Sequence, residues 1–469
     1  MKQAGEKIKK LEKELTGTLG AEWVSREGNS LVVRPRTAEE VAAILQKANK
    51  TGTPVRPKGG GTGWWSSTRP PEWGILLHLT RMNEVAAVDE DVMTVTAEAG
   101  ITFDKLDEVL ASRGYRVVLF PESGKVATLG GHIQTWGTAP HSSSVFEDQA
   151  TQILGLDVVL PTGEILPTGT GALTTARGHF ARRFFPADLT GLFLGSEGAF
   201  GVIVRAALKI HRRPEVILMR IVAFKEAPPL IRLLRRLQEG QRGGGLSTLV
   251  EQRLVPKEMM VTAIPRLQAS LGREVRHLLV LRAEGDRDDA ERHLAKACAF
   301  AVEEGGEVAE DEIPEWWSGR YVVQAASLGK GQKIMIVAFA PFGRLQEAFS
   351  LTEKFNQKHN LKLGLIGYPF GGPVFLAHAV IPWDAAEPET REEALAQARE
   401  FMEGLVRIGC VPHRVGTDFL PIMVEKLNPG YFEFVKRIKK MLDPKGIMNP
   451  GVIVPVEGAE RERKGRKRA

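Results

Sequence analysis

Several features that define other classes of protein are scarce or absent in this 469-residue chain. It has two cysteines, Cys298 and Cys410, which are too few for a disulfide scaffold, an iron–sulfur cluster or a cysteine-rich zinc site. No apolar run approaches the roughly 20 residues that a membrane span needs, and the N-terminus lacks the apolar stretch of a secretory signal. We therefore expect a cytoplasmic protein with reduced thiols.

A large excess of one charge is also lacking. The 63 basic and 57 acidic residues give a net charge of +6, and residues 457–469 carry six of the bases and three of the acids. We expect residues 456–469 to form a disordered basic tail that could weakly contact an anionic membrane or an acidic partner. No basic helix interleaved with aromatic residues is present, so we expect no nucleic-acid partner.

The first 213 residues alternate between short strands and helices. Thr37 and Glu40 form a capping box that predicts a helix running to about Lys50. The patterns of apolar and turn residues also predict strands at 74–79, 92–97 and 115–120, a β-hairpin at 153–166 and a strand at 201–210.

After Pro214 the apolar residues follow longer amphipathic helices. These helices are predicted at about 228–239, 286–304 and 387–407, with strands between them, which is typical of an α+β unit with its own core. A last helix at 431–441 precedes a turn-rich segment.

Three glycine-rich segments lie in the first 201 residues, at 57–64, 121–137 and 194–201. Successive glycines permit positive φ and leave backbone N–H groups unshielded, which is the geometry of an anion-binding nest. Residues 58–63 read Lys-Gly-Gly-Gly-Thr-Gly and lack both the Gly-Lys-Ser/Thr of a P-loop and the third glycine of a Rossmann fingerprint. A phosphate-cradling loop of another type stays open.

The order of these segments resembles the FAD-binding flavoproteins of the vanillyl-alcohol oxidase / p-cresol methylhydroxylase superfamily, and most closely its glycolate oxidase and D-lactate dehydrogenase group. The matching stretches are Arg34–Val41, Lys58–Gly63, Lys125–Gly131, Leu154–Glu164, Asp188–Gly201 and Leu442–Gly451.

The resemblance implies an α+β protein built from a two-subdomain FAD-binding domain at 1–213, a cap domain at 214–430 and a C-terminal segment at 431–455 that returns to the FAD domain. The residues that it implies as FAD contacts are Lys58, Gly59, Gly60, Gly61, Thr62, Gly63, Trp64, Pro121, Gly124, Thr128, Gly130, Gly131, His132, Glu197, Gly198, Gly201, Val202 and Asn449. His132 could instead be a structural histidine.

The same resemblance implies that FAD is bound without a covalent link. In relatives that attach FAD in the first loop a histidine follows the glycines, and Thr62 occupies that place here. Cysteine, the other attachment residue, is absent from the second loop.

In the cap, the resemblance implies residues for oxidising a 2-hydroxy acid. Arg320, in a Trp-x-x-Arg motif, would hold the substrate carboxylate with its planar fork. His413 falls where relatives place the histidine of a Glu-His-Gly motif and would act as general base. Pro412 and Arg414 replace the flanking glutamate and glycine, and we therefore expect no metal site.

Three functions stay open. The first is a lactate- or glycolate-type dehydrogenase that passes electrons to a quinone, an electron-transfer flavoprotein or a partner subunit. The second is an oxidase of a larger alcohol or phenol, in which Tyr368 and Arg414 would act and the aromatic residues Trp316, Trp317, Phe370 and Phe375 would line the cap. The third is a non-catalytic FAD-binding subunit of a complex.

Overall fold

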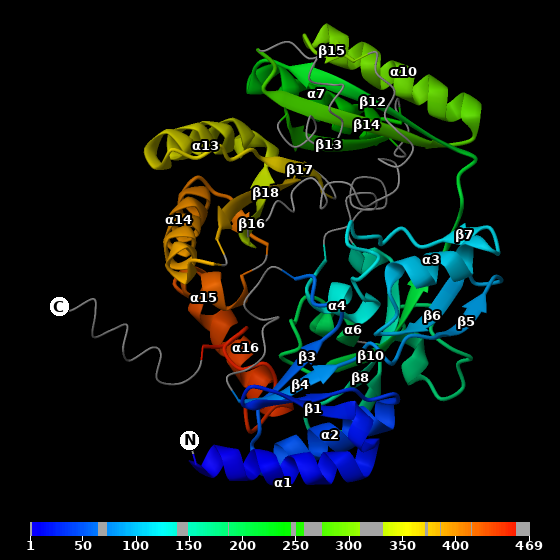
Figure 1. Ribbon diagram of the computed structural model, residues 1–469. Helices are drawn as coiled ribbons and strands as arrows, with labels where there is room; N and C mark the ends of the chain where they lie inside the picture. The colour runs from blue at the N-terminus through cyan, green and yellow to red at the C-terminus, as the bar shows by residue number, and fades with distance from the viewer. Residues whose placement is uncertain are drawn as a thin grey trace.

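The computed structural model describes residues 2–63, 73–137, 149–185, 187–244, 250–257, 274–309, 332–370, 374–384, 386–413 and 415–455. Two bodies are visible in Figure 1: an N-terminal part, drawn in blue to green, and a cap built by the middle of the chain, drawn in green to orange. Among the described residues, no helix combines the length and the apolar character needed to cross a membrane.

The N-terminal part begins with a four-stranded sheet. Its strands lie in the order β1 (Val24–Glu27), β2 (Ser30–Val33), β4 (Gly74–His78) and β3 (Val55–Lys58), and the last three run parallel to one another. Helices α1 (Lys2–Leu19) and α2 (Ala38–Thr51) bury their apolar faces with this sheet.

Helix α2 has the ends that the sequence predicts. The Thr37 hydroxyl accepts a hydrogen bond from the N–H of Glu40, and Gly52 terminates the helix in the left-handed conformation at φ 67°.

A second, five-stranded sheet follows, and its strands pair antiparallel. The order is β5 (Val85–Asp89), β6 (Thr94–Glu98), β10 (Val202–Lys209), β8 (Ile153–Val159) and β9 (Ile165–Pro167). The predicted hairpin is therefore confirmed as β8–β9. Helices α3 (Phe103–Ala111), α4 (Leu129–Gln134) and α6 (Leu189–Phe193) belong to this subdomain.

The predicted strand at 115–120 is wrong beyond its first two residues. β7 comprises Tyr115–Arg116 alone and pairs with the equally short β11 (His211–Arg212). Residues 117–120 are irregular but buried in the core under the second sheet. Burial, not strand pairing, therefore explains this apolar run.

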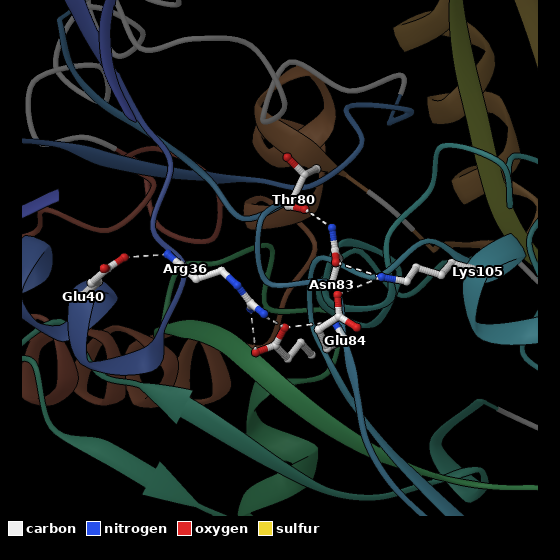
Figure 2. Close-up of polar contacts among 7 residues, drawn as sticks. Arg36, Glu40, Thr80, Asn83, Glu84 and Lys105 are labelled. Atoms are coloured by element: carbon white, nitrogen blue, oxygen red, sulfur yellow. Dashed lines mark hydrogen bonds and ion pairs between the residues drawn. The ribbon is translucent and has the colours of Figure 1, made fainter. Parts of the chain in front are cut away.

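A polar network joins the two subdomains (Figure 2). Arg36, between β2 and α2, donates through Nη1 to both carboxylate oxygens of Glu98 on β6, at 2.9 and 3.2 Å. Glu98 also accepts from the backbone N–H of Glu84, and Lys105 on α3 donates to Glu84 and Asn83, at 3.0 Å each. The start of α2 is thereby tied to the second sheet.

The cap is built on one eight-stranded antiparallel sheet. Its strands lie in the order β15 (Glu307–Val308), β12 (Val216–Phe224), β14 (His277–Gly285), β13 (Val250–Pro256), β17 (Ile366–Pro369), β18 (Val374–Trp383), β16 (Gln332–Pro341) and β19 (Val411–Pro412). Helices α7 (Ala227–Arg242), α10 (Arg287–Glu303), α13 (Leu345–His359), α14 (Pro388–Arg407) and α15 (Gly416–Val424) accompany it.

The two faces of the cap sheet differ in character. Alternate residues such as Ile336, Ala338 and Leu281 face the helices and form a largely apolar core. The opposite face, turned toward the N-terminal part (Figure 1), carries polar groups among its apolar ones. Because side chains alternate along a strand, this second face is the one that can meet a ligand held by the N-terminal part.

The chain finally returns to the N-terminal part. Helix α16 (Pro429–Leu442) runs down from the cap in Figure 1, and Met448 forms a parallel bridge with Val55 of β3. The α+β architecture with a returning C-terminal segment is therefore confirmed.

Candidate functional site

The first two glycine-rich segments meet in space. A Cβ placed on Gly59 would lie 1.9 Å from Oγ1 of Thr128, and one on Gly60 would lie 1.8 Å from the carbonyl oxygen of Val126. Both distances are far below any real contact, so the glycines are required by the approach of the second segment. Two segments that the resemblance implies as FAD contacts are therefore in direct contact with each other.

Polar groups in this junction are available to a ligand. Among the described residues, the N–H groups of Gly59 and Gly60 donate to no protein acceptor. The buried Oγ1 of Thr128 also has no hydrogen-bond partner among the residues that the structure describes. Gly61 has a φ of +69° that a larger residue would adopt with strain. Such groups suit the pyrophosphate of a dinucleotide, because a buried donor needs a partner.

The third glycine-rich segment lies against the same junction. A Cβ on Gly198 would lie 3.0 Å from Cγ of Pro57 in the first segment. Gln134, at the end of α4, accepts from the N–H of Glu197 at 2.7 Å and donates to the carbonyl of Gly201 at 2.8 Å. Val202 follows as the first residue of β10. Three segments far apart in sequence thus surround one place.

Asn449 clamps the returning C-terminal segment onto this place. Its N–H donates to the carbonyl of Val55 at 2.9 Å, its Oδ1 accepts from Nε of Arg56 at 2.8 Å, and its Nδ2 donates to the carbonyl of Glu197. Lys439 of α16 adds bonds to the carbonyls of Ala199 and Met448, at 2.7 Å each.

Not every predicted glycine faces a ligand. A Cβ on Gly124 would meet the ring of Phe120 at 2.5 Å, and one on Gly130 would meet Cβ of Ala99 at 2.6 Å. Their small size therefore serves packing within the protein. Pro121 is buried, and Lys58, Thr62, Gly63 and Gly131 are partly buried at the junction.

His132 is packed as a core residue. Its ring lies edge-on to Phe103 with the centroids 5.0 Å apart, and a Cβ on Gly137 would lie 1.9 Å from Nδ1. Its role toward FAD stays a prediction. Trp64, Arg320 and Arg414, together with Trp316 and Trp317, lie outside the described residues.

His413 lies where the cap meets the N-terminal part. Its backbone N–H donates to the carbonyl of Val337 on β16, and its ring centroid lies 4.6 Å from that of Phe339 and 6.3 Å from that of Phe370. From the N-terminal part, the ring of Trp136 lies perpendicular to that of His413, with the two centroids 6.4 Å apart. The histidine thus sits in an aromatic surround drawn from both bodies.

The expectation that Phe375 lines this place is wrong. Phe375 is on β18 but faces the helix-covered core, where its ring contacts Phe342 with centroids 6.3 Å apart. The alternation of side chains along the strand sends its neighbour Leu376 to the other face instead.

Tyr368, His378 and Arg253 share the face of the cap sheet that is turned toward the N-terminal part. Tyr368 on β17 is buried, and its ring lies 6.0 Å from that of His378 on β18. Arg253 on β13 is also buried and pairs with Glu122 of the second glycine-rich segment. Sequence reasoning missed Arg253, because a single arginine in a strand of mixed polar and apolar residues carries no motif.

A second buried ion group links the two bodies. Arg116 of β7 donates to both carboxylate oxygens of Glu284 on β14, and Arg282 pairs with the same carboxylate at 2.7 Å. Burial opposes ionisation of Glu284, but the hydrogen bond from Arg116 and the charges of both arginines outweigh it and lower its pKa to about 2.

Comparisons with known families fit this geometry. A family model described as "FAD binding domain" matches residues 29–169, and one described as "FAD linked oxidases, C-terminal domain" matches residues 249–453.

Within the described residues, no group of three or more histidine, cysteine, aspartate or glutamate side chains could hold a metal ion.

Similar proteins are found over nearly the full length. Glycolate oxidase subunit GlcD of Bacillus subtilis is 23% identical over 92% of this chain and 90% of its own. The mitochondrial D-lactate dehydrogenase [cytochrome] of Arabidopsis thaliana is 28% identical over 91% of this chain and 73% of its own.

Solved structures share the fold. A 4-ethylphenol oxidase from Gulosibacter chungangensis superposes with a TM-score of 0.83 over 97% of this chain and 98% of its own, at 18% identity. A p-cresol methylhydroxylase also gives 0.83, over 96% and 97% of the two chains, at 15% identity.

Proposed function

We propose that this chain, which belongs to the FAD-linked oxidoreductases of the vanillyl-alcohol oxidase / p-cresol methylhydroxylase superfamily, dehydrogenates a 2-hydroxy acid of the lactate or glycolate type. It is an enzyme of the glycolate oxidase and D-lactate dehydrogenase type that uses FAD and acts on CH–OH groups. The proposal concerns the substrate, the residues that act on it and the electron acceptor.

FAD, when bound, supplies the acceptor for the hydride that leaves the carbinol carbon. The N–H groups of Gly59 and Gly60 would hold its pyrophosphate. Asn449 and Gln134 would keep the third segment, with Glu197 and Gly198, in place beside it. These contacts would position the cofactor under the cap sheet.

His413 is the proposed general base that takes the hydroxyl proton as the hydride leaves. The observation that carries this role is its position at the junction, within 6.4 Å of Trp136 on one body and 4.6 Å of Phe339 on the other, measured between ring centroids. Imidazole is the side chain most often used as a general base. Arg320 stays the proposed carboxylate ligand, and Tyr368 the proposed proton relay.

Anaerobic titration tests the substrate. Purified holoenzyme is mixed with D-lactate, L-lactate and glycolate, and the flavin band is followed. Bleaching with one of them supports the proposal, and silence with a panel of 2-hydroxy acids refutes it. His413→Gln should slow bleaching by about 10²- to 10⁴-fold, the usual contribution of a general base.

A larger alcohol or phenol is the second candidate substrate. The aromatic surround of His413, from Phe339, Phe370 and Trp136, favours it because such rings bury an apolar or aromatic substrate body. If the enzyme forms peroxide in air with a phenolic alcohol but not with lactate, the substrate is the larger alcohol or phenol. With a hydroxy acid, electrons would instead pass to a quinone, an electron-transfer flavoprotein or a partner subunit.

A further inference from the structure

Arg253 is a buried cation on the face of the cap sheet that is turned toward the N-terminal part. It is 8% exposed, and its guanidinium pairs with the carboxylate of Glu122 across the junction of the two bodies. Glu122 belongs to the turn at 121–124 that precedes the second FAD-binding loop. The side chains of the pair are 10% and 18% exposed, so both charges are largely removed from water.

The bonding of Arg253 is incomplete. Among the described residues its Nε has no hydrogen-bond partner, although a buried guanidinium donor normally finds one. Arg116 bonds both oxygens of Glu284 through its two terminal nitrogens, and among the described residues its Nε likewise has no hydrogen-bond partner. Arg253 therefore keeps donor capacity for a further carboxylate.

Polar neighbours continue from Arg253 along the sheet. Leu254 and Gly367 are register partners in β13 and β17, which places Arg253 beside Tyr368. Burial lowers the pKa of Arg253 to about 10, with Tyr368 acting in the opposite direction, so the guanidinium stays charged at neutral pH. The row continues to His378, whose register partner Val337 accepts the hydrogen bond from the N–H of His413.

We propose that Arg253 is a further ligand of the substrate carboxylate, in addition to the proposed ligand Arg320, and that Glu122 is the counter-ion which neutralises Arg253 until the substrate arrives. The inference rests on the proposed function, since it names a second residue that holds the acid group of the 2-hydroxy acid. Arg253 reaches the second FAD-binding segment through Glu122, so an anion bound there lies between the cap and the cofactor site. Glu122 competes with that anion because two carboxylates cannot share one guanidinium without repulsion.

Oxalate, an unreactive carboxylate, tests the site without turnover. Holoenzyme is titrated with oxalate while the flavin spectrum is followed, for the wild type and for Arg253→Gln, Arg253→Lys and Glu122→Gln. Loss of a charged hydrogen-bonding partner should weaken oxalate binding about 10- to 150-fold in Arg253→Gln, and less in Arg253→Lys. Glu122→Gln should tighten it. Arg287→Gln, at an exposed pair on α10, is the matched control and should change nothing.

Oxalate binding within twofold of wild type in an FAD-replete Arg253→Gln overturns the inference. If Arg253→Gln loses FAD, the other two variants decide. The inference then requires that Arg253→Lys binds oxalate more weakly than the wild type and that Glu122→Gln binds it more tightly. Wild-type binding that depends on Arg253, with no 2-hydroxy acid reducing the flavin, would keep the anion site and refute the proposed substrate. If a hydroxy acid reduces the flavin of Arg253→Gln as fast as that of the wild type, the anion site is refuted and the proposed substrate is kept.

Discussion

Adding one methyl group to Gly59 should separate the two loops that are proposed to hold the FAD pyrophosphate. In Gly59→Ala the new Cβ would lie 1.9 Å from Oγ1 of Thr128 and 3.2 Å from its Cβ. Overpacking of this kind typically costs about 1–3 kcal/mol. If that cost falls on the bound conformation of the loops, the Kd for FAD rises about 5- to 150-fold.

A double-mutant cycle locates the cause. Most of the clash is with the hydroxyl of Thr128, so Thr128→Ala should restore part of the FAD affinity lost in Gly59→Ala. The same substitution should not rescue Gly60→Ala, whose Cβ would meet the backbone oxygen of Val126 at 1.8 Å. Gly17→Ala on α1, where a Cβ meets nothing within 4 Å, is the control. It should retain FAD and gain about 0.5–1 kcal/mol of stability.

Fluorescence titration of apoprotein with FAD measures the affinity of each single and double variant. Additive effects of Gly59→Ala and Thr128→Ala, with no coupling, would show that the loops do not touch. Unchanged FAD affinity in Gly60→Ala would remove the junction from the cofactor site altogether.

Three further outcomes are expected. FAD at 100 times its Kd should stabilise the folded protein by about 2.7 kcal/mol, and equal Tm values with and without FAD would contradict the cofactor site. The lowered pKa of Glu284 means that its ionised form stabilises the fold above pH 4.5, and that about 3 kcal/mol is lost as pH falls from 4.5 toward 2. In acid titrations followed by circular dichroism, Glu284→Gln should therefore lack this pH-dependent loss of stability. Asn449→Ala removes hydrogen bonds to Arg56 and Glu197, so FAD should dissociate faster in stopped-flow release; an unchanged rate would make the clamp irrelevant to FAD.

Local sequence signals predicted much of this protein. The Thr37–Glu40 capping box and Gly52 defined α2 because a helix end needs partners within one turn. The hairpin at β8–β9 and helices α10 and α14 followed from short-range turn chemistry and apolar periodicity. The ordered series of glycine segments, through the family resemblance, indicated FAD as the cofactor.

Other features depend on which strands and bodies meet. Residues 117–120 have the composition of a strand but no partner to pair with, and Phe375 faces the helices because of its parity on β18. A sequence window contains neither fact. The packing of His132 against Phe103 and Gly137 is equally invisible, since nothing local marks a histidine as buried.

The sequence by itself indicated helix ends and turns, because glycine and capping residues encode those backbone conformations within a few positions. Through the family resemblance it also indicated the fold class and FAD as the cofactor. The tertiary structure alone decided the pairing of Arg116 with Glu284 and of Arg253 with Glu122. Such pairs join residues more than a hundred positions apart. Their electrostatic interaction is strong because folding has removed the water between the two bodies.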